Sequence, residues 1–537
     1  MNTTKKTKIG RLVSIFLFTA SLAACRKNNN GPTGVINTDA IDVNVDTRGV
    51  KIQMWTGFGS DMTEQLNEVL DDFTKLTGIV VEHESKGGYD NLLKAINLSA
   101  TQGAYPHIAN GYPDHFASYI KSNILLRLDG LLANDANRYN FTKNDVKYDK
   151  DGIMLMKYED FYKDYTLENE TLEFKEDGTG YVDGVPFNKS TEVMVYNSTF
   201  FDWAIANKDL AKGLTGGVEI KVPETWADVK TVGMAINTLC KPLFKTANSD
   251  GKILGSDGVA YDSTDACIQA NAEVVINMSA VAEEDFRPFT YDAQANMFIT
   301  LVRQYGGQFT EVDKTETGKG YAVFNNPQAV EAMKMVQDLF DNNVLGIPAK
   351  WNELYCSTPF KAYKSFMNIS STAGLKNVDN NSFKVKCTHI PYKDADHKFV
   401  ISQGTSLGLF DKGSDAERVA AWKLMVYLSQ QANGKFAAAT GYFPTCDFAF
   451  NSDEYFNYQD SSLKSSVDIL RQSSSKVNSD EYVGNHWTKF VDPGFRGSAD
   501  IRAAAELIPG YLMTNYYGSV EATLNEVEKT LIDYIKK

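Results

Sequence analysis

The residues from 181 to 197, YVDGVPFNKSTEVMVYN, constrain the fold more than any other stretch of this chain. Asp183-Gly184 predicts a tight hairpin, because glycine accepts the positive φ that such a turn needs, and Pro186 suits the edge of a new extended run. Four hydrogen-bonding side chains then stand in a row, directly before the apolar run 193–196: Asn188, Lys189, Ser190 and Thr191. The segment indicates a strand that enters the core beside a binding cleft. The alternative is a polar hairpin shoulder that leads into an ordinary buried strand.

The first 48 residues predict an export signal and a tether rather than a folded element. Residues 1–24 combine a basic head with an apolar run that is too short to span a bilayer. They end in Leu-Ala-Ala before Cys25, which matches the bacterial lipobox, so we expect cleavage at this point and a lipid on Cys25. An ordinary secretory signal with a chance cysteine is the alternative. Residues 25–48 are rich in asparagine and predict a flexible tether.

Size and charge limit the classes of protein. Removal of the signal leaves 537 − 24 = 513 residues, more than one core usually carries, so we expect two lobes. The formal charge of −14 repels phosphate backbones and disfavours nucleic acid as a partner. Five cysteines remain besides Cys25, an odd number without C-x-x-C spacing, which favours neither a disulfide scaffold nor a zinc site. One bridge, from Cys240 to Cys267, stays open; the other three are Cys356, Cys387 and Cys446.

Hydrophobic periodicity alternates between strand and helix. The pattern predicts, in order, a strand at 51–55, a helix at 63–77, a strand at 79–82, a helix at 90–100 and a strand at 106–109. This rhythm is typical of a parallel α/β sheet whose loops face a ligand crevice. Further helices are expected at 226–239, 327–342, 416–430 and from about 519, with a strand running into a helix N-terminus at 366–374.

Seven short segments, spread over residues 49–537, give a family resemblance. They are MWTGFGSD, SKGGYDNL, GYPDHF, PFNKST, FMNISSTAGLKNV with a later IPY strand, SQGTSLGLF with TGYFP, and FRGSADIR. Each is generic, but their order resembles the extracellular solute-binding proteins of sugar and glycerol-phosphate ABC importers. The resemblance implies a two-lobed, type II periplasmic-binding-protein fold of the α/β class, with the chain crossing between lobes at 188–191. It implies an N-terminal lobe of 49–189 plus 358–396 and a C-terminal lobe of 190–357 plus 397–537.

The resemblance also implies which residues contact a ligand. Tyr89 takes the place of an aromatic residue and Asp114 that of a hydroxyl acceptor in the first lobe, while Tyr442 and Arg502 act from the second. The other implied ligand contacts are Phe58, Ser60, Ser190, Ser371, the backbone of Gly404, and Tyr291 with Asp292, which stand where relatives carry a Trp pair. An aromatic plate with planar polar groups suits a sugar.

Simpler readings of these residues exist. Tyr89 and Tyr442, both beside glycine, could cover turn backbone. Arg502 could pair with Glu506 on the surface of a helix, and Ser371 could be only a helix cap.

Enzyme readings were weighed against this one. Residues 404–408 satisfy G-x-S-x-G, but Ser406 is followed by a predicted strand instead of the helix that a nucleophile elbow needs. Asp114 and Asp292 could form a glycosidase pair. A calcium loop ending at 149–152 has Lys147 at its first ligand position, and no HExxH, Walker A or GxGxxG motif occurs. We therefore expect no catalysis, no cofactor and no metal.

The resulting hypothesis is a monomeric binding protein, held outside the cytoplasm on the bacterial cell membrane by its lipid. It delivers a carbohydrate to the transmembrane subunits of an ABC permease that has a separate ATPase. The alternatives are a secreted lipoprotein hydrolase (glycosidase or serine hydrolase) and a surface adhesion or scaffold lipoprotein. The latter would predict repeats or a β-rich pattern, and neither is present.

Overall fold

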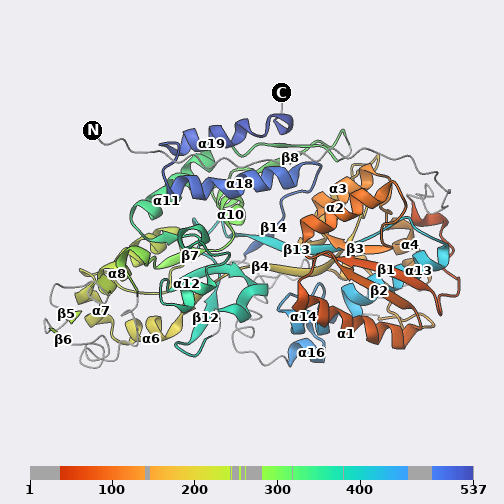
Figure 1. The fold of residues 1–537 in the computed structure, drawn as a ribbon, viewed down its shortest axis with the longest axis horizontal. Coiled ribbons are helices and arrows are strands. Elements are labelled where there is room, and N and C mark those ends of the chain that lie inside the picture. The colour runs from red at the N-terminus through yellow and green to blue at the C-terminus, as the bar shows by residue number, and fades with distance from the viewer. Residues whose placement is uncertain are drawn as a thin grey trace, which may run out of the picture.

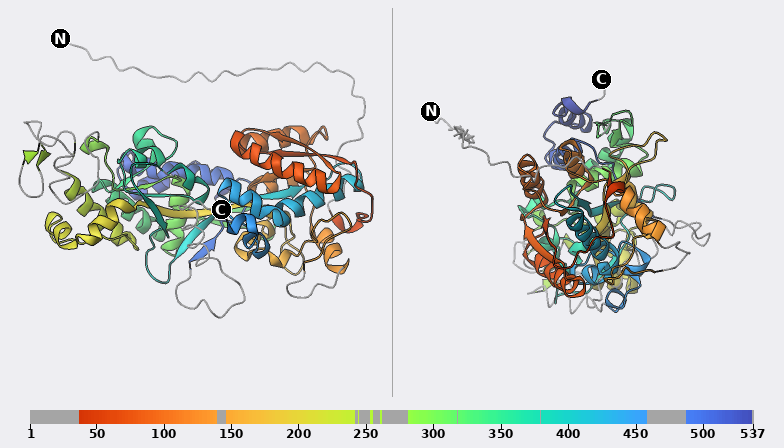
Figure 2. Two further views of the ribbon diagram at one scale, coloured as in Figure 1. Left: turned by 90° about the horizontal axis from the view of Figure 1, so that it is seen from below. Right: turned by 90° about the vertical axis from the view of Figure 1, so that its right-hand side faces the viewer.

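Two α/β lobes lie side by side along the long axis of the molecule (Figure 1). The computed structural model describes residues 37–138, 146–241, 244, 253–254, 260–261, 281–316, 318–378, 380–457 and 487–535. Each lobe has its own hydrophobic core, and two long strands run from one lobe into the other. The left view in Figure 2 shows the same division from below. The expected two-lobed α/β architecture is confirmed.

The first lobe begins with the predicted alternation of strand and helix. Its early elements are β1 (Lys51–Thr56), α1 (Ser60–Thr77), β2 (Val80–Ser85), α2 (Tyr89–Ala100), β3 (Ile108–Gly111), α3 (Pro113–Lys121) and α4 (Asp129–Arg138). Strand β1 is central and pairs in parallel with β2 and with β3. Helix α1 buries Leu66, Val69 and Phe73 from one face and ends at Gly78, whose φ of 75° provides the left-handed cap.

Five later helical segments belong to the first lobe. They are α13 (Asp415–Val426), the π-helical turn η8 (Tyr427–Gln431), α14 (Asn433–Thr440), α15 (Asp447–Phe450) and α16 (Asp453–Phe456). Residues of α13 and α14, among them Trp422, Leu424 and Phe436, share one buried cluster with Phe58, Phe73 and Phe187. The C-terminal third of the chain therefore supplies a large part of this cluster.

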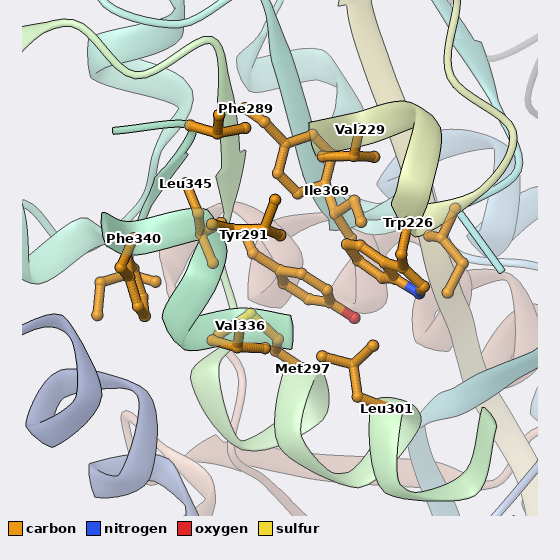
Figure 3. Close-up of a cluster of buried hydrophobic side chains, with 14 of the residues drawn as sticks. Trp226, Val229, Phe289, Tyr291, Met297, Leu301, Val336, Phe340, Leu345 and Ile369 are labelled. Atoms are coloured by element: carbon orange, nitrogen blue, oxygen red, sulfur yellow. The ribbon is translucent and has the colours of Figure 1, made fainter. Parts of the chain in front are cut away.

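The second lobe is built around a short mixed sheet. Its strands are β7 (Phe289–Tyr291), β10 (Leu345–Gly346), β11 (Met367–Ser371) and β12 (Val385–Thr388), and β14 (Thr488–Phe490) pairs at its edge with the start of β13 (Phe399–Leu409). The main helices are α6 (Ser198–Ala206), α7 (Lys208–Leu214), α8 (Trp226–Cys240), α10 (Gln294–Gln304), α11 (Pro327–Asp341), α12 (Ser357–Lys361), α18 (Ser498–Met513) and α19 (Val520–Lys529). Figure 3 shows Trp226, Phe289 and Met297 converging from α8, β7 and α10 into one core.

Strands β4 (Val185–Asn197) and β13 connect the lobes as an antiparallel pair. The first half of β4 contributes Val185 and Phe187 to the first core, and its second half pairs with β11 and β12. Strand β13 runs the other way, from β14 in the second lobe to β3 in the first. At the predicted crossover, residues 188–191 pair with 402–405 where the two cores meet.

The packing divides the later segments differently from the expected lobe boundaries. Residues 358–396, expected in the first lobe, include β11 and β12, which pair with β7 and β4 of the second. Conversely 406–450, expected in the second lobe, pack on β3 and α1 of the first. The reason is that β13 returns the chain to the first lobe, so the helices that follow it are carried there too.

The hairpin expected at Asp183-Gly184 lies elsewhere. The turn is at 175–179, where Lys175 N–H donates to the carbonyl of Thr179 at 2.7 Å and Gly178 has a φ of 82°. Gly184 is needed for a different reason: a Cβ there would overlap the ring of Phe116 and the carbonyl of Leu407. The expected strand at 390–392 is reduced to one bridge between Tyr392 and Thr225.

Candidate functional site

A tyrosine cluster lies at the first-lobe side of the crossover. Tyr89, the first residue of α2, packs edge-on against Tyr112, with ring centroids 5.1 Å apart. Asn188 donates from Nδ2 to the Tyr89 hydroxyl at 3.3 Å and accepts a hydrogen bond from Thr405 on the neighbouring strand. Burial raises the pKa of Tyr442, and Asn188 and Tyr89 lie close enough to its hydroxyl to oppose the rise. Tyr89 and Tyr442 therefore lie beside one amide, and Tyr112 packs on Tyr89.

Two residues at the ends of neighbouring strands, Gly57 and Asn110, hold the backbone beside the tyrosine cluster. The loop after β1 carries Gly57, where a Cβ would overlap the Tyr89 ring and backbone. Asn110 at the end of β3 accepts from the Gly57 N–H at 3.1 Å and donates to the Thr405 hydroxyl at 3.2 Å. The carboxyl ends of β1 and β3 are therefore locked to the crossover strand beside Tyr89.

A polar network forms the second-lobe side of the crossover. Glu192 on β4 is buried and accepts from the Tyr291 hydroxyl at 2.5 Å and from Asn296 Nδ2 at 3.0 Å. Asn296 in turn accepts from the Arg502 guanidinium through Oδ1. Burial raises the pKa of Glu192 to about 8, although these hydrogen bonds and Arg502 oppose the rise. Figure 3 shows the Tyr291 ring lying among apolar side chains.

The tyrosine cluster and the polar network meet across the lobes. Burial raises the pKa of Tyr112, Tyr442 adds to the rise, and the charge of Arg502 opposes it, so Arg502 acts on a first-lobe hydroxyl. From the second lobe, Tyr355 is 63% exposed and lies close enough to Tyr442 to contribute to its raised pKa, of which burial is the main cause. Aromatic and polar groups of both lobes therefore face one region.

The structure brings five of the predicted contacts into this region. Tyr89 and Tyr442 belong to the tyrosine cluster, and Tyr291 and Arg502 to the polar network. Asp114, in the first turn of α3, acts electrostatically on Tyr112. Tyr442 was expected to act from the second lobe. It packs in the first-lobe core instead, because α14 leads into it after β13 has returned.

Asp292 lies at the margin of the polar network. Its carboxylate accepts from the Cys356 N–H at 2.5 Å, and burial raises its pKa. It also raises the pKa of Glu192, for which burial is the main cause, so the two carboxylates interact.

Five further candidates have structural roles in the described chain. Phe58 is 1% exposed and stacks on Phe436 at 5.9 Å, so it is part of the core. Ser60 is exposed at the start of α1 and donates to Asp61 at 3.2 Å. The remaining three shape the crossover: Ser190 donates to Gln403 at 3.5 Å, Ser371 caps the 3₁₀-helix η7 (Thr372–Asn377), and Gly404 has a φ of 92° where β13 abuts Asn188.

Sequence reasoning missed Tyr112, Glu192, Asn296 and Tyr355 as site residues. Tyr112 and Glu192 stood inside segments that carried the resemblance, next to Asp114 and Thr191, and could have been found there. Asn296 is one of several polar residues of helix α10, and Tyr355 follows Leu354 in a loop. Neither position has a local signal.

The G-x-S-x-G sequence does not form a nucleophile elbow. Ser406 lies inside β13, is fully buried, and donates to Glu168 at 3.1 Å. Lys189, also buried, donates to Ser406 at 3.2 Å and forms an ion pair with Glu168. Burial lowers the pKa of Lys189 while Glu168 opposes that change. These three side chains fill the interior of the crossover, and a reacting carbonyl group has no access to Ser406.

In the loop that resembled a calcium site, the carboxylates pair with a lysine from another helix. Asp149 and Asp151 face the ammonium group of Lys423 from α13, at 3.1 and 2.5 Å. Within the described ranges, no group of three or more His, Cys, Asp or Glu side chains is arranged to hold a metal ion. Cys240, Cys356 and Cys446 are buried thiols, whereas Cys25 and Cys267 lie outside the described residues, so the expected lipid and the open disulfide are not visible here.

Known structures share this fold over almost their whole length. The cyclic α-maltosyl-1,6-maltose binding protein from Arthrobacter globiformis matches with 16% identity and a TM-score of 0.58, over 89% of this chain and 97% of that one. UgpB from Mycobacterium tuberculosis, solved with glycerophosphocholine, has 14% identity and a TM-score of 0.59, over 90% and 98%. The sugar-binding protein MalE from Xanthomonas citri has 15% and 0.57, over 90% and 96%.

The amino-acid sequence also matches a protein-family model. Comparison with curated protein sequences gives no significant match. The model described as bacterial extracellular solute-binding protein, however, matches residues 68–460, which include the crossover, the tyrosine cluster and most of the polar network. This chain belongs to the bacterial extracellular solute-binding protein family.

Proposed function

We propose that the protein binds a carbohydrate between its lobes and delivers it to an ABC permease. One observation carries the proposal. Three tyrosines of the first lobe, Tyr89, Tyr112 and Tyr442, lie near polar groups of the second lobe at the crossover. Sugars present apolar ring faces and a rim of hydroxyl groups, so they need flat aromatic surfaces together with fixed donors and acceptors.

The tyrosine cluster and the polar network together supply hydrogen-bond donors and acceptors. The Arg502 guanidinium donates in a plane, the hydroxyls of Tyr112 and Tyr442 donate and accept, and the Asn188 amide does both. Tyr355 is exposed on the second lobe and is available to contact a ligand from that side. The ligands of the similar structures support this class of ligand. One of these proteins is named for binding cyclic α-maltosyl-1,6-maltose and one for binding sugar, and the third was solved with glycerophosphocholine.

Delivery follows from the family and from the N-terminal sequence. We infer that Cys25 carries a lipid that holds the monomeric protein outside the cytoplasm at the cell membrane, with residues 25–48 as a tether. The permease and its ATPase are then separate chains. No helix in the described part of the chain is long and apolar enough to cross a membrane.

The protein performs no catalysis in this proposal. Burial of Ser406 under Lys189 and Glu168 argues against a serine hydrolase. Asp114 accepts a hydrogen bond from the N–H of His115 at 3.0 Å and Asp292 one from Cys356, so both carboxylates already have structural partners. A glycosidase reading predicts that bound oligosaccharide is cleaved.

The test is a thermal-shift and calorimetry screen over mono-, di- and trisaccharides, with recovery of the ligand afterwards. A sugar at a hundred times its Kd should add roughly 2.7 kcal/mol to the free energy of unfolding. It should be recovered chemically unchanged. Failure of every sugar to bind, or turnover of the bound sugar, would contradict the proposal.

A matched pair of variants places the ligand. Tyr355 and Tyr516 are both exposed, at 63% and 67%, but Tyr516 lies beyond the end of α18 and away from the crossover. Tyr355→Ala should weaken sugar binding by about 1 kcal/mol or more, since it removes an aromatic face. Tyr516→Ala should leave binding unchanged. Equal affinities in the two variants would remove Tyr355 from the site.

A further inference from the structure

Arg502 occupies a central electrostatic position between the lobes. It projects from α18, donates to the Asn296 side chain, and lowers the pKa of Tyr112 against the effect of burial. A guanidinium group stays charged at all accessible pH values. The net charge that Arg502 presents to a ligand therefore depends on the acids around it.

Two acids on different elements interact electrostatically with Arg502. Glu192 on β4 is linked to it through Asn296, which donates to Glu192 at 3.0 Å and accepts from Arg502. Asp492, in the segment between β14 and α18, accepts from the Thr310 hydroxyl at 2.7 Å. Burial raises the pKa of Glu192 to about 8 and that of Asp492 to about 7, and Arg502 opposes both rises.

The other charged and titratable groups near Arg502 affect its net charge less than Glu192 and Asp492 do. Arg303 on α10 opposes the pKa rise of Asp492 but stacks over the Phe399 ring at 5.0 Å and is exposed. The second lobe adds Tyr291, the last residue of β7, and Asp292, which follows it. The first lobe adds Tyr112, Asp114 and Glu168, and the charge of Glu168 is balanced by its ion pair with Lys189. Glu192 and Asp492 are thus the acids best placed to change the charge at Arg502.

We propose that Glu192 and Asp492 set the net charge that Arg502 presents between the lobes, so that the site takes neutral ligands when both acids are ionised and also admits anionic ones when they are protonated. The inference rests on the proposed function and adds the charge class of the ligand. Its physical basis is that charges in a partly buried site interact more strongly than in water.

The experiment compares two sugars that differ by one charge. Maltose and its uronic acid analogue, with one C6 hydroxymethyl group oxidised to a carboxylate, keep their own charges constant from pH 6 to pH 9. Calorimetry on the full chain should show that the affinity for the uronic acid, divided by that for maltose, falls at least about tenfold between pH 6 and pH 9.

Variants then assign this change to the two acids. In Glu192→Gln with Asp492→Asn the affinity ratio should stay at its acidic value up to pH 9, and each single variant should remove part of the dependence. Glu506→Gln is the matched control, because Glu506 is exposed four residues along the same helix as Arg502. That variant should behave as the wild type.

The outcomes separate the inference from the proposed function. A ratio that does not change with pH in the wild type overturns the inference while maltose binding still supports the function. A pH-dependent ratio that persists in the double variant also overturns it. If neither sugar binds at any pH, nor any other sugar in the screen, the proposed function fails and the inference falls with it.

Discussion

Replacement of Glu192 by glutamine should remove the pH dependence of stability that this buried carboxyl causes. The buried carboxyl titrates at about pH 8 in the fold and at about 4.5 in the unfolded chain. Since the folded protein holds this proton to higher pH than the unfolded chain does, the free energy of unfolding falls as pH rises from about 4.5 to about 8. Below that window the protonated acid carries no such penalty.

The size of the effect follows from the two pKa values. A difference of about 3.5 pKa units corresponds to about 5 kcal/mol, because each unit is worth about 1.4 kcal/mol. Glutamine removes this term but cannot accept from both Tyr291 and Asn296 as well as a carboxylate does, which costs about 1 kcal/mol. Glu192→Gln should therefore be only slightly less stable than the wild type at pH 5, where the two effects nearly cancel, and several kcal/mol more stable at pH 9.

Urea unfolding at several pH values between 5 and 9 measures this crossing. Asp492 adds its own pH dependence to both proteins, so the quantity to follow is the difference between variant and wild type. Glu506→Gln, with an exposed carboxylate removed, should give a small and constant difference. Parallel curves for Glu192→Gln and the wild type would refute the assignment of a raised pKa to Glu192.

Three other substitutions test separate parts of the structure. Gly404→Ala should lower the free energy of unfolding by about 2 kcal/mol or more, because the new Cβ would overlap the carbonyl of Asn188 and φ is 92°. Urea unfolding measures this change, and an unchanged stability would contradict the crossover geometry. Ser406→Ala should leave sugar recovery and affinity close to those of the wild type, whereas turnover that disappears in the variant would support a hydrolase. Cys25→Ser should move the protein from the membrane to the soluble fraction with its sugar affinity intact, and a membrane pellet that keeps the variant after a high-salt wash would count against the lipid anchor.

The early alternation of strand and helix was predictable because it is local. The strand that begins at Lys51 and the helix at 226–239 follow from periodicity, capping residues and glycine stops, and the structure has both within a few residues. The crossover was predictable for a similar reason: polar side chains stand in a row where β4 leaves one core for the other.

Strand partners were not predictable, because pairing joins residues far apart in the sequence. Nothing near Met367 indicates that β11 lies between β7 and β4, and nothing near Tyr442 indicates that its ring packs in the first lobe. For the same reason Asp183-Gly184 resembled a turn. Gly184 is required by the close approach of Phe116, which a local pattern cannot show.

The crossover strands also determine how this chain can be cut. The first sheet contains β1, β2 and β3 from the N-terminal part, but its fourth neighbour is the end of β13, which follows residues 198–398 of the second lobe. A fragment ending before Phe399 would expose the edge of β3, and with it the unpaired backbone groups that favour aggregation. Neither lobe is therefore a candidate for expression on its own. Two co-expressed fragments should reassemble only if the cut leaves both β4 and β13 whole.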